Sequence, residues 1–179
     1  MFEINYRMIT DVDYWGGLSL EQIDKEGEIE GFFQLVLNNN EYGYYHNRDL
    51  GQGEEGFDLL SIWFHNLMKV CLYLDTSKYI ALKDIETFDT WIEFIPKGDY
   101  ISVSIMNSNS SPSEFIILEP FSNASYPEWK DISIPKEEFK SIVIQRANDF
   151  IEELLEINKL FLKSQSTESL LALLSKIKK

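Results

Sequence analysis

Two histidines and one cysteine are the side chains of this 179-residue chain with the most obvious catalytic or metal-binding chemistry. His46 ends a segment of alternating residues, and His65 shares the polar side of a helical pattern with Ser61 and Lys69. No spacing places a carboxylate beside either histidine, and neither a G-x-S-x-G nor an H-E-x-x-H motif is present. Cys71 falls near an apolar stripe and is predicted to be a small core residue. The sequence therefore predicts no catalytic residue, no metal ligand and no cofactor.

Residues 51–56 (GQGEEG) match the G-x-G-x-x-G pattern of dinucleotide-binding loops. Two carboxylates stand inside the loop where a pyrophosphate would bind, and the polar segment before it is unlike a buried parallel strand. We interpret the motif as a turn before a helix, with Glu54, Glu55 and Asp58 satisfying the helix N-terminus.

Other acidic residues stand within strand-like segments. Glu28 and Glu30 are two residues apart and project from one strand face, an arrangement that could mimic a paired-carboxylate site. A solvated strand face is the simpler interpretation. Glu93 shares a face with Trp91 and Ile95, which indicates either a sheet edge or a partly buried acid.

The formal net charge is −14, and it is unevenly distributed. Residues 1–60 contain thirteen acids and three bases, residues 61–120 contain eight and four, and residues 121–179 contain nine of each. Direct binding to nucleic acid or to an anionic membrane is disfavoured, because both need a basic surface. A cationic partner would be steered toward the N-terminal third, although acidity can also serve solubility alone.

Aromatic residues are frequent in this acidic third: Tyr14, Trp15, Tyr42, Tyr44 and Tyr45. Aromatic rings among carboxylates are what a surface for a basic protein would contain, and the alternative is that they pack a hairpin against a helix. The predicted partner-binding residues are Glu28, Glu30, Tyr42, Tyr44, Asp49, Glu54 and Glu55.

Hydrophobic periodicity predicts the elements that would position these residues. Alternation predicts strands over residues 2–7, 28–37, 41–46, 90–95 and 100–106, with further short strands at 115–118 and 129–134. A broad apolar stripe predicts a helix over residues 56–74. Residues 11–17 and 107–113 are predicted loops, and 96–99 a tight turn.

The C-terminal part is predicted to be helical over about residues 135–179, with a break at residues 164–167 that divides it into a helix pair. We therefore expect a single α+β domain over residues 1–179. A mainly antiparallel sheet would pack against one central helix, followed by the C-terminal helix pair.

The N-terminus lacks the pattern of a signal peptide, and the most apolar segment is interrupted by His65, Asn66 and Lys69. The single cysteine is typical of a reducing compartment. These features predict a cytoplasmic protein with no membrane segment.

Three segments in this order carry a resemblance to a family: GFFQLVLNNNEYGYY, DLLSIWFHNLM and DTWIEFIPKGDYISVSI. Together with the acidic N-terminal part, residues 28–106 resemble the small acidic α/β immunity proteins encoded beside bacterial polymorphic toxins. The resemblance is one of general character and carries over no functional residue. It implies a cytoplasmic, non-enzymatic inhibitor that occludes a basic toxin domain, often a nuclease.

Two other functions stay open. One is an enzyme or small-molecule-binding domain whose pocket, around His46 or His65, is assembled from residues far apart in the sequence. The other is an adaptor that self-associates through the C-terminal helices, where apolar residues repeat at spacings of three and four between Phe139 and Phe161.

Overall fold

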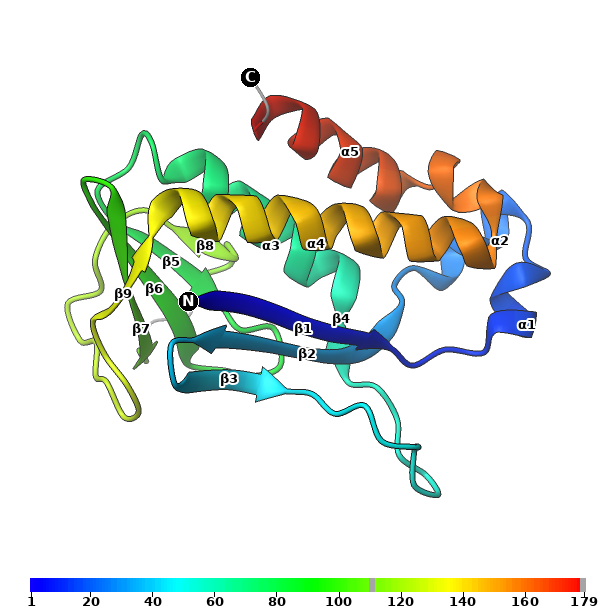
Figure 1. Cartoon of the computed structure of the whole chain (residues 1–179), viewed down its shortest axis with the longest axis horizontal. Helices are drawn as coiled ribbons and strands as arrows, with labels where there is room; N and C mark the ends of the chain where they lie inside the picture. Colours follow the sequence, from blue (N-terminus) through cyan, green and yellow to red (C-terminus); the bar gives the residue numbers. More distant parts are fainter. Residues whose placement is uncertain (110–111, 178–179) are drawn as a thin grey trace.

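The structure is a computed structural model that describes residues 1–109 and 112–177. Over these residues the chain forms two antiparallel sheets, five α-helices and a short 3₁₀ helix (Figure 1). The predicted α+β class is therefore confirmed, and the strands are divided between two sheets where the sequence pattern indicated one.

Sheet A comes from the N-terminal third of the chain and contains β1 (Phe2–Met8), β2 (Glu30–Leu37), β3 (Asn40–Tyr44) and β4 (Asp58–Leu59). β2 pairs with β1 and β3, and the beginning of β2 also pairs with β4. Asn38 and Asn39 form a two-residue hairpin loop, in which Asn38 has φ +56°, a conformation that asparagine tolerates well.

Sheet B has the strand order β8 (Ile116–Ile117), β5 (Ile80–Lys83), β6 (Thr90–Lys97), β7 (Tyr100–Asn107) and β9 (Ile132–Pro135). The predicted hairpin between residues 90 and 106 is present as β6 and β7. Its turn is shorter than expected, because Pro96 and Lys97 still pair within the sheet. The turn itself is Gly98-Asp99, and the φ of +65° at Gly98 favours glycine.

The two long helices join the sheets into one core. In Figure 1, α4 (Lys136–Ile157) runs along β1, and α3 (Leu60–Tyr73) lies beside it. The Phe64 ring on α3 lies 5.1 Å from both the Tyr6 and the Phe150 rings. Burying rings of this size contributes about 2–3 kcal/mol each, so this contact is a major link between sheet A and the helices.

The apolar stripe on α4 is used inside the chain. Phe139, Val143, Ala147 and Phe150 are all fully buried in the shared core. The stripe that suggested self-association is therefore covered by the chain's own sheets and helices.

Two short helices precede β2. Residues 11–17, predicted to be a loop, contain α1 (Val12–Gly16), because the Asp11 side chain accepts a hydrogen bond from the Tyr14 amide and caps the turn. α2 (Leu20–Glu26) was not predicted, although Ser19 and Gln22 form a capping box that is visible in the sequence.

The C-terminal helix pair is present, but the predicted break is wrong. α4 ends at Ile157, the 3₁₀ helix η1 spans Lys159–Lys163, and α5 (Gln165–Ile177) follows. Asn158 causes the break, since its extended backbone lets its amide donate to the Trp15 and Leu18 carbonyls, each at 3.0 Å. Of the residues predicted to break the helix, Ser164 lies between η1 and α5, and Gln165, Ser166 and Thr167 form the first turn of α5. Residues 178–179 of the predicted pair and 110–111 of the predicted loop at 107–113 lie outside the described residues.

Within residues 1–109 and 112–177, no helix combines the length and the apolar character needed to cross a bilayer.

Candidate functional site

The segment between β3 and β4, residues 45–57, extends below sheet A in Figure 1 and is held in shape by one carboxylate. Glu54 accepts hydrogen bonds from both Arg48 guanidinium nitrogens (2.7 and 2.8 Å) and from the Gly51 amide (2.8 Å). Its Oε1 also lies 2.7 Å from His46 Nε2. The hydrogen bonds from Arg48 and then Gly51 lower the pKa of Glu54 to about 2. Glu54 is therefore ionised at neutral pH and fixes the 45–57 loop.

Aromatic rings line the side of this loop that faces sheet A. Phe32 is only 1% exposed, and its ring centroid lies 4.7 Å from that of His46 and 5.3 Å from that of Tyr44. Phe57 covers the same ring at 5.9 Å. Tyr44 and Phe57 nevertheless remain 43% and 48% exposed. Each ring therefore presents apolar area to solvent while it packs against the buried Phe32 ring.

Four of the seven predicted partner-binding residues lie in or next to this loop. Tyr44 precedes it, Asp49 and Glu55 are exposed on it, and Glu54 is the residue that fixes it. Glu30 is exposed and, by strand alternation, projects from the same face of β2 as Phe32, which the loop covers. We call Glu30, Tyr44, Asp49, Glu55 and Phe57 the acidic–aromatic surface.

Tyr42 and Glu28 lie elsewhere. The Tyr42 hydroxyl donates to Asp84, just after β5, and so connects sheet A to sheet B. Burial and this carboxylate raise the pKa of Tyr42. Glu28 lies outside β2, so the expected shared strand face with Glu30 is not formed, and its carboxylate faces a cavity described below.

Sequence reasoning missed Phe88, which is 92% exposed in the turn between β5 and β6. The pKa of Glu86 in the same turn is raised by its partial burial and by the charges of Asp84 and Glu30, which places the turn within electrostatic range of the acidic–aromatic surface. A single phenylalanine beside acidic residues gives no periodic pattern in the sequence, so only the structure reveals that Phe88 is exposed.

The interpretation of residues 51–56 needs one correction. α3 begins at Leu60 with no capping side chain, and Glu54 instead binds Arg48 and Gly51. Asp58 is 4% exposed and accepts from the Phe33 amide (3.0 Å) and the Trp63 indole (2.9 Å). The carboxylates thus organise the loop and its attachment to β2, and they do not cap the helix.

The open question on Glu93 is resolved in favour of burial. β6 is a central strand of sheet B, and Glu93 is 3% exposed. The Tyr126 hydroxyl donates to its Oε1 at 3.0 Å. Cys71 is buried as predicted, and its burial raises its pKa to about 12, which makes the thiol a poor nucleophile.

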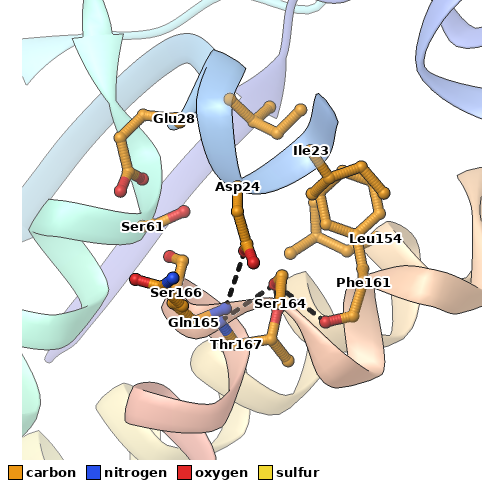
Figure 2. Close-up of a pocket in the computed structure, with 12 residues that line it drawn as sticks. Ile23, Asp24, Glu28, Ser61, Leu154, Phe161, Ser164, Gln165, Ser166 and Thr167 are labelled. Carbon is orange, nitrogen blue, oxygen red and sulfur yellow. Dashed lines mark hydrogen bonds between the residues drawn. The ribbon is translucent and has the colours of Figure 1, made fainter. Parts of the chain in front are cut away.

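A cavity of about 290 Å³ lies between α2, α3 and the beginning of α5 (Figure 2). Its apolar wall is formed by Ile23, Ile29, Leu154 and Phe161. Its polar wall contains Asp24, Glu28, Ser61, Ser164, Gln165, Ser166 and Thr167. These residues come from distant parts of the sequence, so the cavity exists only because η1 returns the chain to α2.

Some polar groups of this cavity have hydrogen-bond partners within the described chain, and one buried oxygen has none. Asp24 accepts from the Gln165 amide at 2.9 Å, and Ser164 Oγ accepts from the Thr167 amide at 3.3 Å. Figure 2 shows the Glu28 carboxylate and the Ser61 hydroxyl on the opposite wall. Within the described residues, Glu28 Oε2 is buried without a hydrogen-bond partner. Ser61 is 5% exposed as a residue, and its hydroxyl lines the cavity beside Glu28.

His65 lines a smaller adjoining cavity of about 170 Å³, together with Glu28, Ser61 and Ser166. Partial burial and the charge of Lys69 lower the pKa of His65. Within the described part of the chain, His65 makes no hydrogen bond to Ser61 or Glu28, so the nucleophile–base contact of a catalytic triad is not formed. Nor do three metal-binding side chains converge anywhere in that part.

Comparison of the chain with protein-family models, curated proteins and solved structures found no match.

Proposed function

We propose that the protein binds and neutralises a basic protein, in the manner of an immunity factor against a cationic toxin domain, through the acidic–aromatic surface. The observation that carries the proposal is the pair of half-exposed rings, Tyr44 and Phe57, flanked by the exposed carboxylates of Glu30, Asp49 and Glu55. Aromatic anchors with a charged rim are characteristic of protein interfaces.

The carboxylates of this surface are available for a partner. Within the described residues, Glu54 is the one acid of the first sixty that forms a salt bridge, and its partners are Arg48 and His46. The C-terminal lysines with salt bridges, Lys136 and Lys140, pair with acids outside this segment. Over residues 1–109 and 112–177, salt bridges therefore neutralise the acids of the N-terminal third only at Glu54. The remaining negative potential would accelerate encounter with a cationic protein.

The shape of the surface supports the same conclusion. Because Glu54 fixes the 45–57 loop through Arg48 and Gly51, the exposed rings are presented on a preformed base. A preformed surface loses less conformational entropy on binding, which leaves more of the interaction energy for affinity.

The test asks whether the gene next to that of this protein encodes a basic domain, and it measures association and dissociation of that domain by surface plasmon resonance. Asp49 and Glu55 are both changed to lysine, which spares Glu54 and hence the loop. We expect the association rate to fall about tenfold and its salt dependence to flatten. The control changes Glu114 and Glu119, which are exposed beside sheet B, and alters the net charge by the same amount.

A second pair of variants tests the aromatic anchors. Tyr44→Ala and Phe57→Ala are each expected to raise the dissociation rate at least tenfold, with little change in the association rate. Equal effects of the charge reversal and its control would contradict the proposed surface. A neighbouring gene without a basic domain, or a basic domain that does not bind, would contradict the function itself.

A further inference from the structure

We propose that the cavity between α2, α3 and α5 is a binding site for a small organic cation that carries a primary ammonium group. This site is separate from the acidic–aromatic surface, and its lining shares no residue with it. The inference therefore stands independently of the protein-binding function.

The acidic residues that line the cavity favour a ligand with a positive charge. Two carboxylates, Asp24 and Glu28, line it, and no lysine or arginine is among its lining residues in the described chain. A buried carboxylate oxygen without a donor, such as Glu28 Oε2, is costly and is relieved by a ligand that donates to it. An anion would be repelled by both acids.

The beginning of α5 does not reverse this selection. A helix N-terminus normally favours anions through its free amides. Here Asp24 already accepts from the Gln165 amide, and the Ser164 hydroxyl accepts from the Thr167 amide. The chain's own acceptors thus occupy two of the amides that an anion would use.

Three acceptor residues line both cavities. Glu28, Ser61 and Ser166 line both the 290 Å³ cavity and the adjoining 170 Å³ cavity, so they stand where the two meet. A primary ammonium group has three donors and no acceptor, which matches one carboxylate and two hydroxyl groups. Glu28 is the most informative of the three, because its Oε2 is buried without a hydrogen-bond partner within the described residues. Ser61, a residue that is 5% exposed, turns its hydroxyl toward the same cavity.

The body of the ligand would lie against the apolar wall. Ile23, Ile29 and Phe161 are each at most 3% exposed and belong to the apolar part of the lining of the larger cavity. A short carbon chain placed there would lose contact with water, as in most small-molecule sites.

The experiment is a calorimetric titration of the full chain with putrescine at neutral pH, with 1-butanol and butyrate as neutral and anionic controls. We expect putrescine to bind and both controls to fail. Nα-acetyl-lysine amide distinguishes the source of the ammonium group: its binding indicates a lysine side chain of a polypeptide, and its failure beside putrescine binding indicates a free amine.

Glu28→Gln keeps the shape of the side chain and removes its charge. We expect it to weaken putrescine binding at least tenfold, because charge-assisted hydrogen bonds contribute the most. The matched control is Glu21→Gln, an exposed acid of the same short stretch of chain. Thermal unfolding of Glu28→Gln should be unchanged or shifted upward, since the unsatisfied charge is gone.

Three results would overturn the inference: no heat of binding for putrescine, equal binding of 1-butanol, or equal weakening by Glu21→Gln and Glu28→Gln. A lower unfolding temperature of Glu28→Gln with unchanged affinity would assign Glu28 a structural role and overturn it as well. Binding of the basic partner should be unaffected by Glu28→Gln, so failure here is distinguishable from failure of the proposed function.

Discussion

Asp58 is an acid whose burial should make the stability of the protein depend on pH near neutrality. Its side chain is 4% exposed, and burial raises its pKa from 3.8 to about 7, against the opposing hydrogen bonds from Trp63 and Phe33. The nearby charges of Asp84 and Glu86 add to the increase. The perturbation is Asp58→Asn, which removes this titration and leaves the other acids in place.

The sign follows from proton uptake. Between pH 3.8 and about 7 the folded protein holds a proton on Asp58 that the unfolded chain has released, so the folded state is favoured by acid. The contribution is fully present below the unfolded pKa and is lost as the pH rises through the folded one. The folded and unfolded pKa values of Asp58 differ by about three pH units. About two of those pH units lie within the interval from pH 5 to pH 8. As the pH rises over this interval, the free energy of unfolding of the wild type should therefore fall by roughly 2.5 kcal/mol relative to that of Asp58→Asn.

The assay is urea unfolding of both proteins at several pH values between about 5 and 8, and the quantity compared is the difference in their free energies of unfolding. The variant also leaves one of the two donors, Phe33 or Trp63, facing an amide nitrogen, which costs about 1–3 kcal/mol at every pH. That offset does not vary with pH, whereas the titration of Asp58 does. A difference that stays constant, or one in which the wild type gains on the variant at high pH, would show that the two donors outweigh burial and that Asp58 is ionised throughout.

Three further predictions concern the scaffold. Gly56→Ala would place a Cβ atom 2.6 Å from the Gly31 backbone nitrogen, and we expect the free energy of unfolding to fall by at least about 2 kcal/mol. An unchanged midpoint of urea unfolding would refute this close approach. Asn158→Ala removes two hydrogen bonds to the carbonyls of Trp15 and Leu18, and we expect chemical unfolding to show a destabilisation of about 1–3 kcal/mol. A destabilisation below about 0.5 kcal/mol would show that water replaces these hydrogen bonds. Cys71, at 1% exposure and with its pKa raised to about 12, should react with a thiol reagent only after unfolding, and fast labelling of the native protein at neutral pH would contradict its burial.

Much of the secondary structure was predictable because periodic patterns extend over whole elements. The alternation from Glu28 to Leu37 marks β2, and the stripe from Leu59 to Leu74 marks α3, since both record the burial of one face. The short α1 and the four-residue β5 lie below the length at which a period can be recognised. The break before α5 was misplaced because Asn158 ends α4 through contacts with carbonyls near residue 16, which no local pattern records.

The sequence by itself determined the α+β class, the uneven charge and the mixture of aromatic and acidic residues near Tyr44, because these depend on composition and on neighbours within a few residues. Only the tertiary structure decided what the individual acids do. Glu54 fixes a loop, Asp58 is buried against β2, and Glu28 faces a cavity made by a helix that begins more than one hundred residues later. A carboxylate's role depends on which donors and which solvent surround it, and chain folding brings those together across sequence distances that no spacing rule spans.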